Sequence, residues 1–439
     1  MSNAPLIRQY LESLRKSEWY AQDQLIDYQR GLLGTLLTHS FDTVPFYRDR
    51  LGHMFGKGGK ILWDRWGDIP LLTKQDIRDN AEALTSTAVP ENHGKVYDRS
   101  TSGSTSEPVA FKQTELHFIA RNCLTVRFQE WHGLNCEQKF AEIRPYPSGQ
   151  ASYPEGESLE TWASEGLIPE QPGPYVKLNI STPIEQQVDW LCRQGPTYLQ
   201  TFPTNARAIA EYVGKHPKSK PQLLGLFSIS ETVNDETRDI CRMHLGHDIM
   251  DIYSASETGN MAIQCPQHAH YHVSGEAVLL EILDDTGTPC PPNTPGQLIA
   301  TPFYNFAMPL IRYALNDIVE TGNPCPCGRG LPVLNRIFGR TRNMFLFPGK
   351  MQVQPDFKTV TWLKYLSPKQ WQVAQTGPLE IEIRLVVGER AAEDMDFDGM
   401  TAYIHQLLRD DITVRYLLVD EIPCLASGKY EDYVCELKA

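Results

Sequence analysis

The chain has 439 residues, of which 41% are hydrophobic and 22% charged, a composition typical of a globular protein. Single hydrophobic cores stop growing at about 250–300 residues, so this length predicts a large domain and a smaller one. The net charge of −13 argues against general binding to nucleic acids or membrane surfaces, since both need basic patches, but it is compatible with a local basic pocket.

The chain carries no obvious targeting or membrane signal. Its first 40 residues lack the charged-then-apolar pattern of a secretory signal, and no apolar run approaches the roughly 20 residues of a membrane span. Its 10 cysteines are too sparse and irregular for a disulfide framework. We therefore expect a cytoplasmic protein without nucleic-acid or membrane partners.

The first third of the chain is predicted to be largely helical. Residues 5–38 carry apolar side chains at three- and four-residue spacing, which is typical of helices. Residues 69–77 read as an extended segment followed by a short helix that Thr73 caps. A longer helix is expected from Thr114 to Trp131.

Between these elements, residues 100–108 form a segment with six hydroxyl side chains and one glycine. Successive N–H groups and hydroxyls in such a loop can converge on an anion, and the helix that follows favours negative charge at its start. The segment lacks the lysine of a Walker P-loop. A phosphate-binding loop and a polar surface loop are both compatible with this composition.

The middle of the chain predicts an α/β core. After a long loop over 145–175, helices alternate with strands, which is typical of a parallel sheet. The helices are expected at 183–194, 204–215 and 233–245, and the strands at 197–202, 223–228 and 248–253. From residue 276 the pattern favours β-strands, which are expected at 278–283, 297–300 and 310–319.

The last hundred residues predict a separate, small α+β domain. Residues 371–376 and 380–387 can pair as strands across a Gly377-Pro378 turn, and a helix at 400–409 and a strand at 413–419 follow. We divide the chain at residues 1–342 and 343–439. The fold class is therefore α/β, with a large N-terminal domain of mixed sheets, a β-rich subdomain within it, and a small α+β C-terminal domain.

Two segments place charges beside predicted strands. In residues 253–259, Glu257 follows a strand, where a carboxylate could ligate Mg²⁺ and Tyr253 could stack on a base; alternatively, Glu257 caps a turn. In residues 309–317, Arg312 and Asp317 lie in or after an apolar strand, so they either pair with each other or face a ligand.

Two further segments are rich in metal-binding or charged residues. Residues 265–272 and 325–328 together supply three cysteines and three histidines, enough for a four-ligand structural zinc site, with free buried cysteines as the alternative. Near the end of the chain, Lys429 taken alone reads as an ordinary solvated surface lysine.

Taken in order, these segments resemble the phenylacetate–CoA ligase family of adenylate-forming enzymes, a superfamily that includes acyl-CoA synthetases, adenylation domains and luciferase. The resemblance runs from residues 44–48 and 69–76 to Lys429. It implies that residues 100–108 cover the ATP phosphates. The nucleotide-binding residues that it implies are Ser100, Thr101, Ser102, Gly103, Ser104, Thr105, Tyr253, Ser254, Glu257, Asp317 and Arg340.

The resemblance also implies the remaining roles. Lys429, on a mobile C-terminal domain, would contact the reacting carboxylate and the α-phosphate, with Glu257 and Arg312 as further catalytic residues. The acid would contact Phe202, Pro203, Ser230 and Ala255. A structural zinc would be held by Cys265, His272, Cys325 and Cys327, with His268 or His270 as alternative fourth ligands.

The sequence departs from the family pattern in two notable places. The phosphate loop ends Ser106-Glu107-Pro108, with a carboxylate where a lysine is usual. The segment after Gly339-Arg340, usually acidic, reads Thr341-Arg342-Asn343. The first departure places a negative charge near the expected phosphates.

The resemblance implies an AMP-forming acid–thiol ligase. It would use ATP and Mg²⁺ to convert a carboxylic acid, expected to be aromatic, into an acyl-adenylate, and then transfer the acyl group to coenzyme A. An amine or a carrier-protein thiol as acceptor and a catalytically silent nucleotide-binding homologue are the alternatives. The acid is not readable from the sequence, and a homodimer is one option for the assembly.

Overall fold

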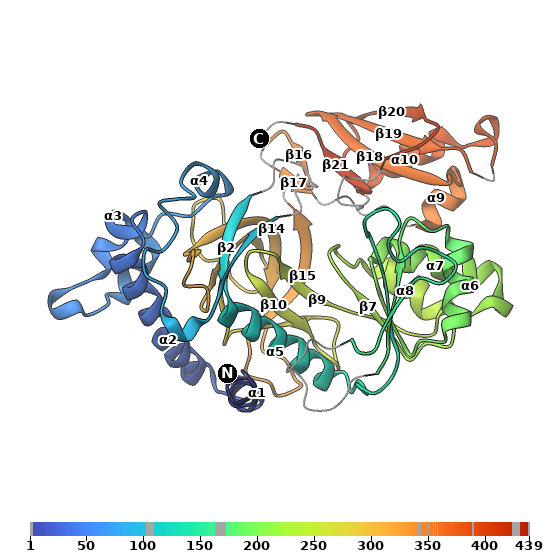
Figure 1. Cartoon of the computed structure of the whole chain (residues 1–439). Coiled ribbons are helices and arrows are strands. Elements are labelled where there is room, and N and C mark those ends of the chain that lie inside the picture. Colours follow the sequence, from blue (N-terminus) through green and yellow to red (C-terminus); the bar gives the residue numbers. More distant parts are fainter. Residues whose placement is uncertain are drawn as a thin grey trace. The chain divides into compact units, whose positions relative to one another are not determined.

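Figure 1 shows the computed structural model of the chain. The structure describes residues 3–101, 109–162, 173–340 and 344–349, and, of residues 351–437, all but 354, 356, 358, 389 and 424–430. The chain forms two compact units, one of residues 1–233 and 237–337 and one of residues 234–236 and 338–439. No described helix is long and apolar enough to cross a membrane. The mobility predicted for residues 343–439 stays a prediction.

The first unit begins with helices, as predicted. They are α1 (Ala4–Ser17), α2 (Gln22–Thr43), α3 (Tyr47–Leu51) and α4 (Lys74–Asp79). Helix α4 starts at Thr73, whose hydroxyl accepts a hydrogen bond from the Asp76 amide at 3.0 Å, while the Asp76 carboxylate accepts one from the Thr73 amide at 2.8 Å. This reciprocal cap confirms the predicted helix start.

Strands β1 (Val96–Ser100) and β2 (Ala110–Thr114) form an antiparallel hairpin that leads into helix α5 (Glu115–Trp131). The hydroxyl of Thr114 caps α5 by accepting a hydrogen bond from the His117 amide at 3.4 Å. Near the other end of α5, the Arg127 guanidinium forms a buried ion pair with Glu276 at 2.7 Å. The Glu276 carboxylate also accepts a hydrogen bond from Ser17 at 2.6 Å, so it joins α5 to the end of α1.

A six-stranded sheet forms the predicted α/β core. Its order is β4-β5-β3-β6-β7-β8, parallel except for the edge strand β4. The strands are β3 (Phe140–Arg144), β4 (Glu157–Leu159), β5 (Tyr175–Asn179), β6 (Tyr198–Thr201), β7 (Gly225–Ser228) and β8 (Ile249–Met250). Strand β4 lies inside the segment predicted to be a long loop.

Helices α6 (Ile184–Gln194), α7 (Pro203–Lys215) and α8 (Asp235–His244) pack on this sheet and bury Trp190, Ile209 and Cys241 against it. On the same strands, alternate side chains point the other way and pack against Phe128 of α5. The alternation predicted from the sequence is therefore confirmed.

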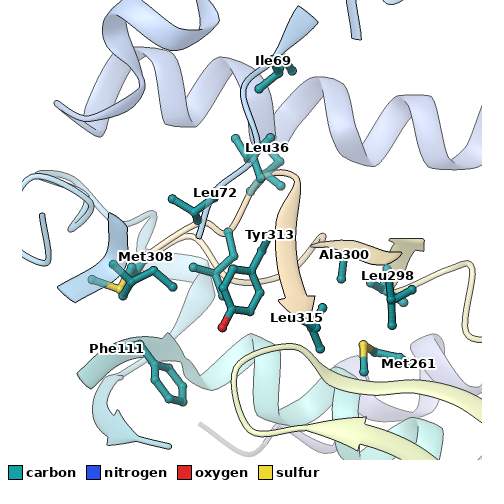
Figure 2. Packing of buried hydrophobic residues seen from close by; sticks show 14 of the residues in the cluster. Leu36, Ile69, Leu72, Phe111, Met261, Leu298, Ala300, Met308, Tyr313 and Leu315 are labelled. Carbon is teal, nitrogen blue, oxygen red and sulfur yellow. The ribbon is translucent and has the colours of Figure 1, made fainter. Parts of the chain in front are cut away.

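A seven-stranded sheet forms the β-rich part, in the order β12-β13-β14-β15-β11-β10-β9. Its strands are β9 (Ile252–Ala255), β10 (Gly259–Gln264), β11 (Tyr271–Val273), β12 (Val278–Leu283), β13 (Pro295–Pro302), β14 (Tyr313–Thr321) and β15 (Val333–Arg340). Figure 2 shows its core, in which Leu36 of α2, Leu72 and Phe111 lie around Tyr313.

The predicted strand at 248–253 is wrong as a single element. Residues up to Met250 belong to the six-stranded sheet, and residues from Ile252 belong to the seven-stranded sheet. Between them, the buried Asp251 carboxylate accepts hydrogen bonds from Ser228 and, at 2.6 Å, from Tyr271. A continuous apolar run does not reveal such a change of sheet, because the pattern of buried residues is the same in both.

The second unit has a four-stranded sheet in the order β20-β19-β18-β21. Strands β18 (Gln370–Gly377) and β19 (Glu380–Val386) form the predicted antiparallel pair, and β20 (Thr413–Leu418) and β21 (Tyr433–Cys435) add parallel strands. Helices α9 (Thr359–Tyr365) and α10 (Phe397–Leu407) and the short pair β16 (Phe345–Phe347) and β17 (Met351–Val353) complete it. Its own core includes Trp362, Ile383 and Ile404.

Candidate active site

The base of the hydroxyl-rich loop is described, and its tip is not. Ser100 ends β1, and the Thr101 amide donates to the Val109 carbonyl at 3.0 Å. In return, the Val109 amide donates to the Thr101 hydroxyl at 3.0 Å, which closes the base of the hairpin. Ser102, Gly103, Ser104, Thr105 and the three residues after them lie outside the described residues.

Two other predicted residues cannot be placed in the site. Lys429 lies outside the described residues, and Arg340 ends β15 with a side chain that is not described. Their predicted roles stay predictions.

The turn after β9 lies next to the β1–β2 hairpin. The Gln113 side chain of β2 donates to the Ser256 carbonyl at 2.9 Å. Glu257 is buried, and its carboxylate accepts a hydrogen bond from the Tyr313 hydroxyl at 3.1 Å. The turn ends at Gly259, whose φ of +80° favours glycine. The turn that holds Glu257 is therefore fixed on both sides by strands distant in sequence.

Tyr253 and Asp317 come together as well. The Tyr253 hydroxyl donates to the Asp317 carboxylate, which joins β9 to β14. The predicted base-stacking tyrosine and ribose-binding aspartate thus lie side by side in the same unit. Ser254, next to Tyr253, is exposed.

Arg312 does not pair with Asp317, which was one of the two predicted arrangements. Its guanidinium forms an ion pair with Glu281 of β12 at 3.1 Å and donates to the Gly67 and Ile69 carbonyls at 2.7 and 2.6 Å. Arg312 precedes β14 and has a φ of +52°, so the strand begins three residues later than predicted. Burial raises the pKa of Glu281, and the charge of Arg312 opposes this.

The contacts of Arg312 explain why residues 69–72 run extended. The Leu72 amide donates to the Arg312 carbonyl at 2.9 Å, and the Ala314 amide donates to the Leu72 carbonyl at 2.9 Å. Sequence analysis missed Glu281. Its signal was a single carboxylate in the apolar run of residues 278–283, because a charge in such a run needs a partner.

The four predicted acid-binding residues lie at the carboxyl ends of three strands. Phe202 and Pro203 follow β6 directly, Ser230 follows β7, and Ala255 ends β9. Phe202 is buried, and Ser230 has a φ of +68°. Their contact with an acid stays a prediction.

A cavity of about 140 Å³ lies between α5 and the six-stranded sheet. None of the four predicted residues lines it. Its walls are mainly aromatic and apolar, formed by Thr125, Phe128, Gln129, Leu134, Phe140, Trp162, Tyr175, Gln200, Phe227 and Ile252. The Gln129 side-chain oxygen is buried, and no described residue forms a hydrogen bond with it. The sequence signal that we did not use was one aromatic residue in each of the three segments that form β3, β5 and β7, namely Phe140, Tyr175 and Phe227.

The predicted metal ligands form a cluster. One side-chain ligand atom from each of Cys265, His272, Cys325 and Cys327 lies within 4.8 Å of the others. The Cys265 and Cys325 sulfurs are 3.8 Å apart, and the Cys327 sulfur is 3.4 Å from His272 Nε2. Burial lowers the pKa of His272 to about 4, so its imidazole is neutral, the form that binds metal ions.

Charged residues surround this cluster. The Arg329 guanidinium donates to the Cys327 sulfur at 3.7 Å and lies 3.6 Å from the Glu18 carboxylate. Glu18 also accepts a hydrogen bond from the Trp131 indole at 2.8 Å. The cluster is thereby tied to the ends of α1 and α5.

Comparisons with known proteins agree with the motifs. No family model matches the chain. It is 26% identical over 350 residues to a phenylacetate–coenzyme A ligase from Thermus thermophilus, covering 76% of this chain and 74% of that one. It is 23% identical over 423 residues to a phenylacetate–coenzyme A ligase from Pseudomonas putida, covering 87% and 90%.

Solved structures show the same fold. A 2-hydroxyisobutyryl-CoA ligase in the postadenylation state matches with a TM-score of 0.75 and 18% identity, covering 96% of this chain and 92% of that one. ATP-bound MatB from Rhodopseudomonas palustris matches with a TM-score of 0.55 and 13% identity, covering 76% and 66%. Along most of its length, the chain is therefore similar in sequence to phenylacetate–coenzyme A ligases, and its fold is similar to that of a solved 2-hydroxyisobutyryl-CoA ligase.

Proposed function

We propose that this chain is an AMP-forming acid–thiol ligase. The carboxylate oxygen of an acid attacks the α-phosphorus of ATP, the bond to the bridging oxygen of pyrophosphate breaks, and an acyl-adenylate forms. The thiolate of coenzyme A then attacks the acyl carbon, and AMP leaves with the electrons of the acyl–oxygen bond.

The convergence of three distant segments at one place carries this proposal. Gln113 of the β1–β2 hairpin binds the Ser256 carbonyl, Tyr313 binds Glu257, and Tyr253 binds Asp317. This arrangement brings the base of the hydroxyl-rich segment, a buried carboxylate and a carboxylate–tyrosine pair together. These are the groups that a nucleotide, its phosphates and Mg²⁺ require.

The residues present fit the nucleotide and its metal ion. Glu257 supplies a buried carboxylate oxygen, the ligand type that Mg²⁺ prefers, and Asp317 supplies an acceptor for ribose hydroxyls. Mg²⁺ would neutralise charge on the phosphates as pyrophosphate leaves. The catalytic role predicted for Arg312 stays a prediction. Because Glu281 and two carbonyls hold its guanidinium, we propose that it also positions the strand that carries Tyr313 and Asp317.

An aromatic acid is the proposed substrate class. Two of the relatives are named phenylacetate–coenzyme A ligases. The cavity between α5 and the sheet supports the same class, because its walls are aromatic and its volume of about 140 Å³ is close to that of cavities of about 150 Å³ that bind benzene.

Free cysteines among the described residues support the predicted cytoplasmic location. Homodimer formation stays a prediction.

The direct test of the function is ATP–pyrophosphate exchange across a panel of aryl and alkyl acids, with and without coenzyme A. We expect exchange with aryl acids and thioester formation when coenzyme A is added. Exchange without thioester formation would point to an amine or carrier-protein acceptor. No acid-dependent exchange with any class would indicate a silent nucleotide-binding homologue.

Substitutions at Asp317 and Arg312 separate nucleotide binding from stability. Asp317→Ala should reduce the rise in melting temperature that ATP produces, while the ligand-free protein melts close to wild type, because the hydrogen bond from the Tyr253 hydroxyl is worth only about 1 kcal/mol. Arg312→Ala should lower the stability of the ligand-free protein by about 3–5 kcal/mol, because Glu281 is left buried without its partner. Thermal melts with and without ATP measure both. A large ligand-free loss in Asp317→Ala would contradict the ribose role.

Lys429 is proposed to stabilise the charge that develops on the α-phosphate as the acid attacks. Lys429→Ala should slow acyl-adenylate formation by about 10²–10³-fold, the effect of losing one preorganised electrostatic group. It should leave thioester formation from pre-made acyl-adenylate nearly intact, because the C-terminal domain is proposed to withdraw this lysine for the second step. Single-turnover measurements of each half-reaction test this, and equal losses in both would argue against domain movement.

We also propose a structural zinc ion at the cluster of Cys265, His272, Cys325 and Cys327. Three thiol sulfurs and a neutral imidazole form the four-ligand donor set of structural zinc sites. Elemental analysis should find about one zinc per chain, and Cys325→Ser should lower both zinc content and stability, since metal binding is coupled to folding. Cys290→Ser, outside the cluster, is the control. Zinc-free protein that melts like the untreated protein would refute the site.

A further inference from the structure

Two arginines that form no ion pair with an acid among the described residues lie beside the proposed nucleotide site. Arg99 comes from β1 and Arg121 from α5, and both side chains are exposed. The Arg99 guanidinium lies 4.7 Å from the ring centre of Phe118 and 5.9 Å from that of Tyr97. The two rings meet edge to face at 5.4 Å. Aromatic contacts therefore hold Arg99 above α5.

Arg121 lies three residues after Phe118 on α5, so the Arg99 guanidinium, which contacts the Phe118 ring, lies over the face of the helix that also carries Arg121. The pKa of Arg121 is lowered first by partial removal from water and then by the positive charge of Arg99. The charge of Arg121 also contributes to lowering the pKa of His117, which burial alone already lowers. No ion pair with an acid is found for Arg99 or Arg121 among the described residues. An excess of positive charge thus gathers at one place in a chain whose net charge is −13.

On the opposite face of the same hairpin, a basic side chain does have an acidic partner. Lys112 of β2 forms an ion pair with Asp98 of β1 at 2.6 Å. Successive side chains on a strand point to opposite faces, so Asp98 and Lys112 lie on one face and Arg99 on the other. A cation that only stabilises the hairpin has an acidic partner, whereas Arg99 has none among the described residues.

Arg121 also lies against the turn that carries Glu257. A Cβ atom built on Gly259 would be 3.8 Å from Cβ of Arg121 and 3.4 Å from Nε2 of His117. His117 is 5% exposed, and its Nε2 has no hydrogen-bond partner among the residues that the structure describes. Arg99 directly precedes Ser100, where the hydroxyl-rich segment begins. That segment, residues 100–108, contains Glu107 and no lysine or arginine.

We infer that Arg99 and Arg121 form a phosphate-binding subsite that supplies the positive charge the hydroxyl-rich loop lacks. The inference rests on the proposed ligase function and adds two residues that the family resemblance did not assign. The ligand chemistry is a phosphate ester or diphosphate, and the reaction offers two sources of it. One is the β- and γ-phosphates of ATP, which leave as pyrophosphate; the other is coenzyme A, which carries a diphosphate and a 3′-phosphate.

The test compares Arg99→Gln and Arg121→Gln with Lys112→Gln, a matched loss of one cation on the other face of the hairpin. The first arm is ATP–pyrophosphate exchange at varied pyrophosphate and ATP concentrations. Loss of a charge-assisted contact worth about 1.5–3 kcal/mol should raise the KM for pyrophosphate about 10- to 100-fold. The KM for the acid should not change, and the difference from wild type should shrink at high salt.

The second arm measures thioester formation with coenzyme A and with dephospho-coenzyme A, which lacks the 3′-phosphate. A raised KM for coenzyme A alone assigns the subsite to the 3′-phosphate. A raised KM for both, with unchanged exchange, assigns it to the diphosphate of coenzyme A. A raised KM for pyrophosphate in the first arm assigns it to ATP.

A third measurement does not depend on catalysis. Inorganic pyrophosphate should raise the melting temperature of wild type and Lys112→Gln, and raise that of the two arginine variants less. If no acid supports exchange in wild type, the ligase function fails, and this shift still tests the subsite. Unchanged KM values for all three phosphate ligands, with an unchanged pyrophosphate shift, would overturn the inference. Each arginine is tested singly, so one misfolded variant leaves the other to decide.

Discussion

The whole arrangement depends on Asp251, where the chain leaves one sheet and enters another. Its buried carboxylate accepts hydrogen bonds from Ser228 of β7 and Tyr271 of β11, and its amide donates to the Gln264 side chain at 3.0 Å. Burial raises the pKa of Tyr271, so the phenol stays protonated and remains a donor. The segment that carries Tyr253 and Glu257 begins immediately after this junction. Its position relative to both sheets is therefore set by one carboxylate that is fully bonded in the interior.

The site is built from residues whose side chains are mostly committed to the protein itself. Glu257 and Asp317 each accept a hydrogen bond from a tyrosine, and Arg312 is surrounded by a carboxylate and two carbonyls. Such pairing holds the groups in place before a ligand arrives, because each rotamer is fixed by a partner. A ligand that takes over a tyrosine's hydrogen bond replaces one partner with another instead of ordering a loose side chain. Arg99 of β1 and Arg121 of α5 differ, since neither forms an ion pair with an acid in the part of the chain that the structure describes.

The sequence allowed the fold class and the motifs to be predicted because both depend on local pattern. Alternating helices and strands, the Thr73 cap and the cysteine spacing are all visible within a few residues. Features that depend on distant partners were missed. The split strand at Asp251, the pairing of Arg312 with Glu281 and the cavity walls each need contacts across tens or hundreds of residues. The family resemblance favoured His272 over His268 and His270 as the fourth metal ligand. The structure distinguishes it because its imidazole lies beside the three cysteine sulfurs.

The contacts along helix α5 limit where the chain can accept insertions and deletions. Along its length it presents Arg121 beside the Glu257 turn, Phe128 in the cavity wall, Arg127 to Glu276, and Trp131 to Glu18. An α-helix turns by about 100° and rises about 1.5 Å per residue. Inserting or deleting one residue after Arg121 would rotate all the later contacts away from their partners together. A single substitution along α5 removes one of these contacts, whereas a change in its length removes several together, so insertions should be confined to the loops around it.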